Sequence, residues 1–357
     1  MMQISPETQL FIREHSSDDV RVLALQAKKY PDIDMPTAIT QIAGRKVAAE
    51  KIPSWWEIEK IWYPKHLSLE QCSSEITARY KARLLQGDSL TDLTGGFGID
   101  CSFLATGFKS ATYVERQEEL CEIAAHNFPV LNLNHINIKN EDGVTYLQAM
   151  SPVDCLFLDP ARRNEHGGKT VAISDCEPNV AELEELLLQK ANRVMIKLSP
   201  MLDLSLALKE LKQTQEVHIL SVNNECKELL ILLGQTSPAE ISIHCVNLFT
   251  KGTQKEQHFV FTREQEQCSE CTYTDSLETY LYEPNASLLK AGAFRSIAAA
   301  YPVRKLHPNS HLYTSDTFIE NFPGRIFRIV NQCSFNKKEV KENLACLLYT
   351  SPSPRDS

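Results

Sequence analysis

A glycine-rich segment directly after a short apolar strand limits what this chain can fold into more than any other feature. The segment reads Leu-Thr-Asp-Leu-Thr-Gly-Gly-Phe-Gly-Ile-Asp, so the strand ends at Asp92 and three glycines follow closely. Gly95, Gly96 and Gly98 let the backbone approach a bound molecule, and the helix expected to follow offers free N–H groups. The pattern predicts a strand–turn–helix unit at a ligand site.

Two familiar glycine-rich fingerprints do not fit this segment. The dinucleotide pattern Gly-x-Gly-x-x-Gly needs a third glycine where this chain has Cys101. A phosphate-binding P-loop needs a Gly-Lys-Ser/Thr triplet, and none follows the glycines. A dinucleotide-dependent dehydrogenase is therefore disfavoured.

Apolar strand-like runs alternate with helix-like segments through the middle of the chain. This βαβα order predicts a parallel sheet covered by helices on both faces. Two later runs lie too close together for a crossover helix, which predicts an antiparallel pair. The expected strands are Ser89–Thr94, Ala111–Glu115, Ile136–Asn140, Cys155–Leu158, Arg193–Lys197, Glu216–Val222, Leu229–Leu233, Glu240–Leu248 and Gln257–Phe261, the expected helices are Ser68–Leu85, Asp100–Ala105, Gln117–Phe128 and Val180–Lys190, and residues 264–277 are expected to be a loop.

The first 60 residues are expected to be helical. Residues 17–29 carry a serine cap, acids in the first turn and lysines in the last, which is the order that the helix dipole favours. Pro36 opens a second expected helix, which runs through Lys51. Three tryptophans follow, and we expect them to anchor this region on the next one as core residues: Trp55, Trp56 and Trp62.

Acidic residues follow each of the first four expected strands. They are Asp92, Glu115, Asp142 with its neighbour Glu141, and Asp159. Glu115 comes 23 residues after Asp92, where it can accept hydrogen bonds from two ribose hydroxyls. A carboxylate after the third strand can bind an adenine amino group. Any one of these acids alone is more often a helix cap or a loop residue, but all four in order at one sheet edge indicate a site.

From about Leu67 to Leu233 the sequence resembles the class I S-adenosylmethionine-dependent methyltransferases. The resemblance implies an α/β fold with a Rossmann-like seven-stranded sheet and S-adenosyl-L-methionine as the cofactor. In that family the glycine loop surrounds the methionine and ribose, the acid after the second strand holds the ribose, and the acid after the third meets the adenine. The cofactor-binding residues implied here are Asp92, Thr94, Gly95, Gly96, Gly98, Glu115 and Asp142. Thr94 stands where the family's loop usually has its first glycine.

The segment Asp159-Pro160-Ala161-Arg162 occupies the position that faces the reacting methyl group and the substrate in that family. The resemblance implies that Asp159, Pro160 and Arg162 are catalytic, with Asp159 accepting a hydrogen bond or a proton from the target group. Amino-group methyltransferases usually carry Asn/Asp-Pro-Pro and an aromatic residue here. The alanine and arginine of this chain put amino-nitrogen methylation in doubt. Arg162 could stack its guanidinium on a base or bind phosphate.

Three other residues near this edge are weaker candidates. Lys197 ends the fifth strand and is read equally well as a surface strand end. Asp203 follows it and is expected to line the same edge. Cys176 is a weak candidate for the covalent route of pyrimidine C5 methylation, and no other cysteine is better placed.

Four further motifs are similar to one bacterial group of methyltransferases with C-terminal ferredoxin-like and THUMP-like domains. The motifs are His66–Ala78 with Tyr80-Lys81, the Asp-Pro-Ala-Arg-Arg segment, Lys197–Asp203 and Asn224–Leu229. The group implies a helical N-terminal domain over 1–65, a methyltransferase domain over 66–262, a ferredoxin-like segment over 278–324 and the start of a THUMP-like RNA-binding domain over 325–345. Residues 346–357 resemble a translated sequencing adapter, so we expect an artefact there and a truncated native chain.

RNA is the expected partner, reached through the C-terminal part of the chain. The net charge of −9 argues against a strong non-specific grip on nucleic acid, but residues 288–345 hold nine basic and only four acidic residues. We therefore expect methyl transfer to a tRNA or rRNA base. A methyltransferase acting on protein or small molecules, and a non-catalytic RNA-recognition module, remain alternatives.

Neither metal nor membrane binding is expected. The single Cys-x-x-Cys, Cys268 to Cys271, has no second pair and is weak evidence for zinc. The longest aliphatic run, Leu229–Leu233, is far too short to span a membrane. The N-terminus has no apolar stretch typical of a signal peptide, so a cytoplasmic location is expected.

Overall fold

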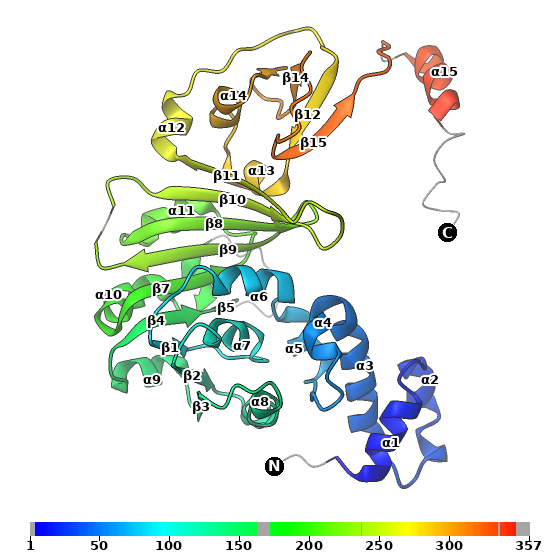
Figure 1. Cartoon of the computed structure of the whole chain (residues 1–357), viewed down its shortest axis with the longest axis vertical. Coiled ribbons are helices and arrows are strands. Elements are labelled where there is room, and N and C mark those ends of the chain that lie inside the picture. The colour runs from blue at the N-terminus through cyan, green and yellow to red at the C-terminus, as the bar shows by residue number, and fades with distance from the viewer. Residues whose placement is uncertain (1–3, 163–171, 237, 335, 348–357) are drawn as a thin grey trace. The chain divides into compact units, whose positions relative to one another are not determined.

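The computed structural model of the chain describes residues 4–162, 172–236, 238–334 and 336–347. The chain forms two compact units (Figure 1). The first contains Met1–Glu264 and Ala286–Ala291, and the second contains Gln265–Asn285 and Gly292–Ser357. The helical N-terminal region and the large sheet therefore belong to one unit. Most of the adapter-like tail expected over 346–357 lies outside the described residues.

The N-terminal region is helical, as predicted. Ser5, Asp19 and Asp34 each accept a hydrogen bond from a backbone N–H in the first turn of the helix that follows them. The helix predicted over 17–29 is shorter than expected, because the α-helix ends at Leu25 and a 3-10 turn, η1, follows. The helices are α1 (Pro6–Glu14), α2 (Val20–Leu25), α3 (Met35–Lys51) and α4 (Pro53–Trp56), with η1 over Ala27–Lys29.

The prediction of a single helix over 68–85 is wrong. Two helices, α5 (His66–Gln71) and α6 (Glu75–Ala82), take its place. Cys72 and Ser74 both have extended backbone, with ψ of 159° and 155°. The break carries the side chain of Ser73 into a buried cluster of charged groups. A continuous helix would point that hydroxyl elsewhere.

The large sheet has nine strands in the order β11-β10-β8-β9-β7-β4-β1-β2-β3 (Figure 1). The predicted Rossmann-like sheet is confirmed, and two strands extend it beyond the expected seven. Strand β9 runs antiparallel to β7 and β8, and β11 runs antiparallel to β10. The remaining pairs are parallel. The strands are β1 (Ser89–Asp92), β2 (Ser110–Glu115), β3 (Ile136–Asn140), β4 (Val153–Leu158), β7 (Ala191–Leu198), β8 (Thr214–Val222), β9 (Glu225–Gly234), β10 (Ser242–Leu248) and β11 (Glu256–Thr262).

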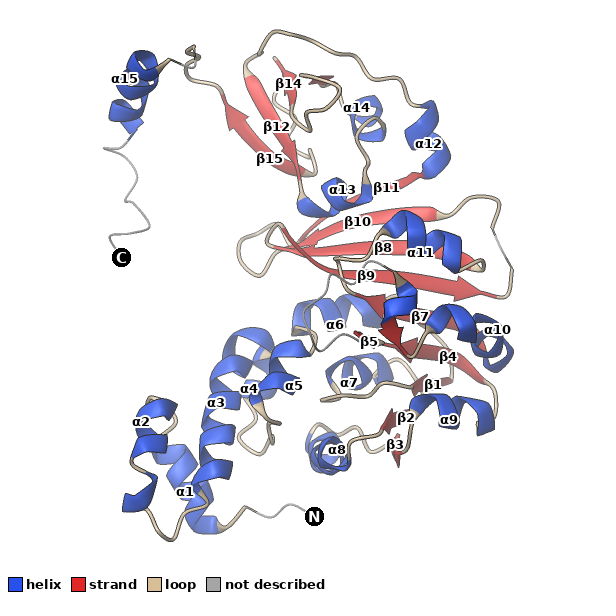
Figure 2. Ribbon diagram, turned by 180° about the vertical axis from the view of Figure 1, so that it is seen from behind, coloured by secondary structure: helices blue, strands red, loops and turns tan. Residues whose placement is uncertain are grey.

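Helices cover both faces of this sheet, as the βαβα pattern predicts. One hydrophobic cluster joins Tyr80 of α6, Leu104 of α7 and Phe128 of α8 to strand residues such as Tyr113 and Phe157. The helices α9, α10 and α11 lie against the opposite face (Figure 2). The helices are α7 (Ile99–Ala105), α8 (Glu118–Val130), α9 (Gly143–Ala149), α10 (Val180–Lys190) and α11 (Leu204–Glu210). Two short strands, β5 (Ala161–Arg162) and β6 (Cys176–Glu177), pair antiparallel, and the 3-10 turn η2 (Ile173–Asp175) directly precedes β6.

The second unit contains a four-stranded sheet in the order β13-β14-β12-β15. Its pairs are antiparallel, and its core includes Tyr282, Tyr313 and Phe322. Residues 264–277 were expected to form a loop, but a helix, α12, begins at Arg263 and ends at Cys268. The strands are β12 (Tyr280–Pro284), β13 (Arg304–Lys305), β14 (Tyr313–Ser315) and β15 (Gly324–Arg328), and the other helices are α14 (Ser296–Ala300) and α15 (Lys337–Leu347), while α13 (Ala286–Ala291) belongs to the first unit.

Candidate functional site

The carboxyl ends of the parallel strands bring the predicted acids to one edge of the large sheet. Asp92 ends β1, Glu115 ends β2, and Asp159 follows β4 directly. Strands β1, β2 and β4 are hydrogen-bonded neighbours in the sheet. The edge that the sequence predicts as the ligand site is therefore built by adjacent strands.

The loop between β1 and α7 needs glycine at three positions. A Cβ on Gly95 would lie 2.2 Å from Cε2 of Tyr113, which is buried beneath the loop. Gly96 and Gly98 have φ of +54° and +86°, which is the left-handed region that side chains disfavour. The Tyr113 hydroxyl donates to the carbonyl oxygen of Gly96 at 2.5 Å. The loop backbone therefore lies directly on β2.

Phe97, between the glycines, anchors the loop to the N-terminal helices. Its ring contacts Trp55 edge-on, with 5.2 Å between the ring centroids, and it also packs near Tyr63. Trp55 is buried in the same hydrophobic cluster, whereas Trp56 is exposed. The core role expected for the tryptophans is confirmed for Trp55, while Trp62 is only partly buried against the same cluster and Trp56 is exposed.

Thr94 ties the glycine loop to the segment after β4. Its hydroxyl oxygen accepts a hydrogen bond from the backbone N–H of Asp159 at 2.6 Å. Its own backbone N–H donates to Oδ1 of Asp92 at 3.0 Å. A glycine at this position could not make the first of these bonds. The departure from the usual glycine thus has a structural function.

Glu115 holds the loop from the neighbouring strand. Its Oε2 accepts from the Gly96 N–H and its Oε1 from the Gln117 N–H, both at 2.9 Å. Each carboxylate oxygen has two lone pairs, so these bonds leave acceptor capacity for ligand hydroxyls. The position suits the ribose role implied for Glu115.

Asp142 also caps a helix. Its Oδ1 accepts from the backbone N–H groups of Val144 and Thr145 at the start of α9. Gly143 beside it lies so close to the residue after β1 that a Cβ would be 2.2 Å from the Leu93 carbonyl oxygen. The side chain of Asp142 is exposed, and every hydrogen bond that the structure gives its carboxylate goes to Oδ1.

Asp159 forms a close ion pair with Lys197 at the end of β7, with 2.5 Å between Oδ2 and Nζ. The side chain of Asp159 is 37 % exposed, whereas that of Lys197 is only 10 % exposed. Lys197 is therefore part of the site and not a surface strand end. Pro160 is buried beside Asp159. The backbone of Arg162 lies in β5, paired with Cys176, but its side chain is outside the described structure.

A buried network of charged side chains continues from Lys197 into the protein. The Nζ of Lys197 lies 3.2 Å from Asp100, and the Nζ of Lys81 lies 2.9 Å from the other oxygen of the same carboxylate. Lys81 also pairs with Glu228 at 2.6 Å. The Ser73 hydroxyl contacts Lys81, Lys197 and Asp100 at 2.7–2.9 Å. The network thus joins α6, α7, β7 and β9 behind Asp159.

Burial and pairing shift the protonation of these groups in opposite directions. Burial alone would raise the pKa of Asp100, but Lys197 and Lys81 outweigh it and hold the carboxyl ionised. Burial would likewise lower the pKa of Lys197, yet Asp100, Asp159 and Glu228 raise it well above its usual range. Burial raises the pKa of Asp159, partly offset by Lys197. The network therefore keeps Lys197 charged.

Asp92 differs from Asp100 and Asp159 because it has no lysine or arginine partner among the described residues. Burial raises its pKa to about 8, although the N–H of Thr94 opposes the shift. Among the described residues, Asp92 Oδ2 has no hydrogen-bond partner. A buried, unpaired carboxyl oxygen beneath the glycine loop is costly, and a bound ligand could satisfy it.

Sequence reasoning missed most of the charged network. Ser73, Lys81 and Glu228 all lie in the motifs that resemble the bacterial methyltransferase group, but their convergence was not predicted. Asp100 was visible only as the acid after the glycine loop. The only sequence signal for the network was that Ser73, Lys81 and Glu228 each lie in one of these motifs, which are far apart along the chain.

Two weaker candidates do not reach the site. Asp203 caps α11, where its Oδ1 accepts from the Leu206 N–H. Cys176 lies in β6 and is 2 % exposed, so its thiol is not presented to a substrate. These positions are accounted for by local structure and packing.

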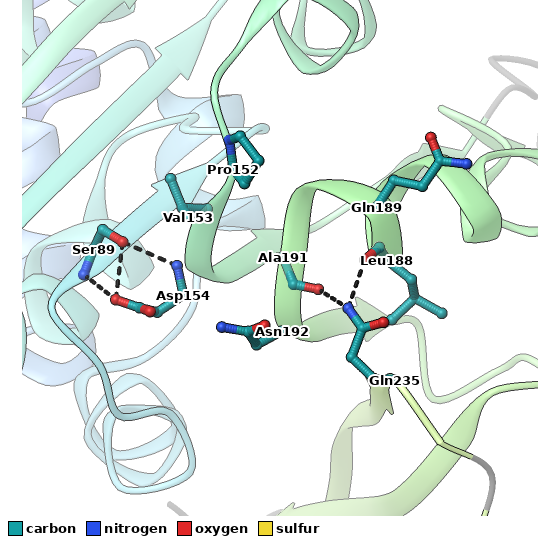
Figure 3. A pocket seen from close by; sticks show the side chains of 9 residues that line it. All are labelled: Ser89, Pro152, Val153, Asp154, Leu188, Gln189, Ala191, Asn192 and Gln235. Carbon is teal, nitrogen blue, oxygen red and sulfur yellow. Dashed lines mark hydrogen bonds between the residues drawn. The ribbon is translucent and has the colours of Figure 1, made fainter.

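A pocket of about 240 Å³ lies at the opposite ends of the same strands (Figure 3). Ser89, Asp154 and Ala191 line it, at the starts of β1, β4 and β7. Asp154 is paired with Ser89, and the Gln235 amide donates to the Ala191 carbonyl (Figure 3). Asp154 and Gln235 thus already have partners within the protein.

The fold and this edge together define a class I methyltransferase fold. The sheet has an antiparallel strand, β9, between β7 and β8, a glycine loop after β1, and acids at or just after the ends of β2, β3 and β4. A crystal structure of a putative methyltransferase from Porphyromonas gingivalis W83 matches it over 98 % of this chain and 88 % of that chain, with 33 % sequence identity and a TM-score of 0.84. The chain belongs to the family of that protein.

Further comparisons give weaker matches. A putative methyltransferase from Streptococcus mutans in complex with SAH shares 13 % identity, over 45 % of this chain and 96 % of its own, with a TM-score of 0.33. An rRNA methylase from Streptococcus thermophilus shares 14 % identity, over 44 % and 93 %, with a TM-score of 0.32. No curated protein sequence matches the chain.

A family model described as a ferredoxin-like domain matches residues 280–323. This stretch begins at β12 and ends just before β15 of the second unit. The ferredoxin-like part of the resemblance is therefore confirmed. As for membranes, none of the helices in the described ranges has the length and apolar character needed to span one.

Proposed function

We propose that this protein is an S-adenosylmethionine-dependent methyltransferase that modifies a base in tRNA or rRNA. The observation that carries the proposal is the combination, at one sheet edge, of a glycine loop held by Glu115 and a carboxylate, Asp159, held by Lys197. The first part suits a nucleoside-bearing cofactor, and the second suits the group that receives the methyl.

The residues at this edge fit the cofactor. Gly95 and Gly96 present bare backbone, Glu115 keeps acceptor capacity for two ribose hydroxyls, and Asp142 has a second carboxylate oxygen for the adenine amino group. The unpaired Oδ2 of Asp92 is suited to a polar or cationic group of the methionine part. When bound, S-adenosylmethionine supplies a methyl group on a positively charged sulfonium.

The chain's own contribution to the reaction is positioning and charge. Asp159 would accept a hydrogen bond or a proton from the target group, and Lys197 fixes which carboxylate oxygen is free to do so. Thr94 fixes the backbone of Asp159 relative to the cofactor loop. Holding donor and acceptor in line supplies most of the acceleration in a direct displacement.

The RNA part of the proposal is supported by the surface of the second unit. Strand β15 lies at an edge of the small sheet, and it exposes Phe327 and Arg325. The guanidinium carbon of Arg325 lies 5.7 Å from the Phe327 ring centroid. Exposed aromatic rings beside arginines are the surfaces on which unpaired bases stack. Residues 325–345 would then begin the RNA-binding THUMP-like domain.

The test is methyl transfer from labelled S-adenosylmethionine to unmodified tRNA and rRNA transcripts. The proposal predicts incorporation into RNA, and a loss of roughly 10²-fold or more in turnover for Asp159→Asn, because the variant removes the acceptor of the target proton. Glu177→Gln, an exposed acid on β6, is the control and should keep full activity. Label in protein or small molecules alone would favour the alternative enzyme. Cofactor binding with no transfer to any acceptor would favour a recognition module.

A further inference from the structure

Three histidines and a glutamate lie together on one face of the outer strands of the large sheet. His218 on β8 and His244 on β10 are direct partners in the parallel register. Glu216 lies two residues before His218, so both side chains share a face. His258 on β11 lies diagonally across from His244. The cluster is not part of the edge that carries Asp92 and Asp159.

The nitrogen and oxygen atoms of this cluster lie at spacings close to those of a metal site. One atom from each of Glu216, His218 and His244 falls within 4.8 Å of the other two. The Oε2 of Glu216 is 3.2 Å from Nε2 of His218, and Nδ1 of His244 is 3.1 Å from Nε2 of His258. Tetrahedral Zn²⁺ with bonds of 2.0–2.2 Å places its ligand atoms about 3.3 Å apart. The Glu216–His218 and His244–His258 distances are both close to this value.

The second polar atom of two of these side chains is held by the protein. The Tyr80 hydroxyl lies 2.9 Å from Nδ1 of His218, which leaves Nε2 facing the cluster. Arg193 binds Oε1 of Glu216 at 2.9 Å, which leaves Oε2 facing it. Metal ligands are commonly oriented by such outer hydrogen bonds. These outer contacts therefore hold one possible ligand atom of His218 and one of Glu216 toward the cluster.

The exposure of the cluster's side chains would also allow a metal ion to reach it from solvent. His218 is buried, whereas His258 is 40 % exposed and Glu216 31 % exposed, so an ion could enter from the solvent side.

We propose that Glu216, His218 and His244 bind a divalent transition-metal ion of the Zn²⁺ class, with His258 beside them to complete a fourfold set. Two imidazoles and a carboxylate favour zinc over Mg²⁺ or Ca²⁺, which prefer oxygen ligands alone. The sequence gives little sign of this site, because Glu216 and His218 lie on β8, His244 lies on β10 and His258 lies on β11.

The site has a structural consequence for the edge described above. Tyr80, which contacts His218, is the neighbour of Lys81 on α6, and Lys81 belongs to the charged network behind Asp159. An ion at the cluster would therefore fix β8 to β10 and hold α6 through the tyrosine hydroxyl. The ion would stabilise the fold without touching the reacting groups.

The test is zinc titration of the tag-free full chain after treatment with a chelator, followed by calorimetry. The proposal predicts one equivalent of Zn²⁺ per chain and a rise in the thermal midpoint of unfolding when zinc is added. His244→Gln should weaken zinc binding by roughly tenfold or more. Glu216→Gln provides a second variant, with the same expected loss, in case His244→Gln does not fold. His307→Gln, an exposed histidine elsewhere, is the control and should bind as the parent does.

Cobalt(II) binding separates this site from the cysteines. The proposal predicts absorption bands of tetrahedral Co²⁺ that lack a thiolate charge-transfer band and persist in Cys268→Ser/Cys271→Ser. Absence of zinc binding would overturn the proposal. So would loss of binding in the double-cysteine variant, or unchanged affinity in both His244→Gln and Glu216→Gln.

Discussion

At the scale of single residues, the site is defined by how each carboxylate is paired. Asp100 and Asp159 have lysine partners, whereas Asp92 is 1 % exposed with one oxygen unpartnered among the described residues. Burial accordingly raises the pKa of Asp92 to about 8. Asp92 is thus a destabilised group in the ligand-free protein, as is common at functional sites.

This residue makes a prediction about stability and pH. Between the ordinary pKa of 3.8 and the raised value of about 8, the folded chain keeps a proton on Asp92 that the unfolded chain has lost. The free energy of unfolding therefore falls as pH rises through this window. Asp92→Asn cannot ionise, so its stability advantage over the parent should grow by about 1 kcal/mol or more from about pH 5 to about pH 8. Urea unfolding at several pH values measures this.

The matched control for that experiment is Asp88→Asn. Asp88 is 70 % exposed, and within the described parts of the chain its carboxylate forms an ion pair with exposed Lys109 alone. Its stability difference from the parent should stay nearly constant over the same pH range. A constant difference for Asp92→Asn as well would contradict the raised pKa.

Thr94 makes a second prediction at this scale. Thr94→Val keeps the shape but removes the oxygen that accepts from the Asp159 N–H. The free energy of unfolding should fall by about 1 kcal/mol, because the N–H loses its partner. Methyl transfer should fall with it, while Thr94→Ser should retain both. Equal turnover in Thr94→Val and the parent would show that this bond does not position Asp159.

At the scale of elements, the break between α5 and α6 decides the architecture behind the site. It places Ser73 and Lys81 against Asp100 of α7 and Glu228 of β9. Lys81 is fully buried. Removing one partner from such a network leaves uncompensated charge in the interior.

Lys81→Met is therefore expected to lower the free energy of unfolding by about 3–5 kcal/mol. The double variant Lys81→Met/Glu228→Leu removes both members of one pair and should recover part of that loss. Lys109→Met, at an exposed pair with Asp88, is the control and should change stability by no more than about 0.5 kcal/mol. Denaturant unfolding measures all three. Similar losses for Lys81→Met and Lys109→Met would contradict a buried network.

The elements also show what sequence reasoning could and could not predict. The strands that carry Asp92, Glu115 and Asp159 were predicted because each is a short apolar run with a local chemical signal at its end. The Lys81–Glu228 pair was missed because its members are 147 positions apart and meet only in the folded sheet. The split of α5 from α6 was missed because the tertiary contact of Ser73, not helix propensity, decides it.

At the scale of the whole molecule, the predicted cofactor site and the predicted RNA-binding strand fall in different units. The predicted cofactor and catalytic residues lie in the first unit, and exposed Arg325, Phe327 and Arg328 of β15 lie in the second. The ferredoxin-like domain was predicted from motif resemblance. The sheet has nine strands and not the expected seven, because β10 pairs with β8 and β11 pairs with β10.

This separation predicts that RNA binding and cofactor binding can be uncoupled. Phe327→Ala/Arg328→Ala should weaken binding of unmodified RNA and reduce its salt dependence by about one unit of slope, because one stacking group and one phosphate contact are lost. The affinity for S-adenosylmethionine should not change. Fluorescence anisotropy at several salt concentrations checks the first expectation, and calorimetry checks the second. Unchanged RNA affinity would show that the RNA-binding surface lies elsewhere.

The most direct test of the account is calorimetric titration of the folded chain with S-adenosylmethionine, beside Glu115→Ala and the control Glu118→Ala. Glu115 contacts the glycine loop, whereas Glu118 is an exposed residue of α8. The account predicts saturable binding by the parent and Glu118→Ala, and affinity reduced by roughly tenfold or more in Glu115→Ala, since charged-group hydrogen bonds contribute about 1.5–3 kcal/mol. Absence of binding by a folded parent chain, or equal affinity in Glu115→Ala, would contradict the cofactor site.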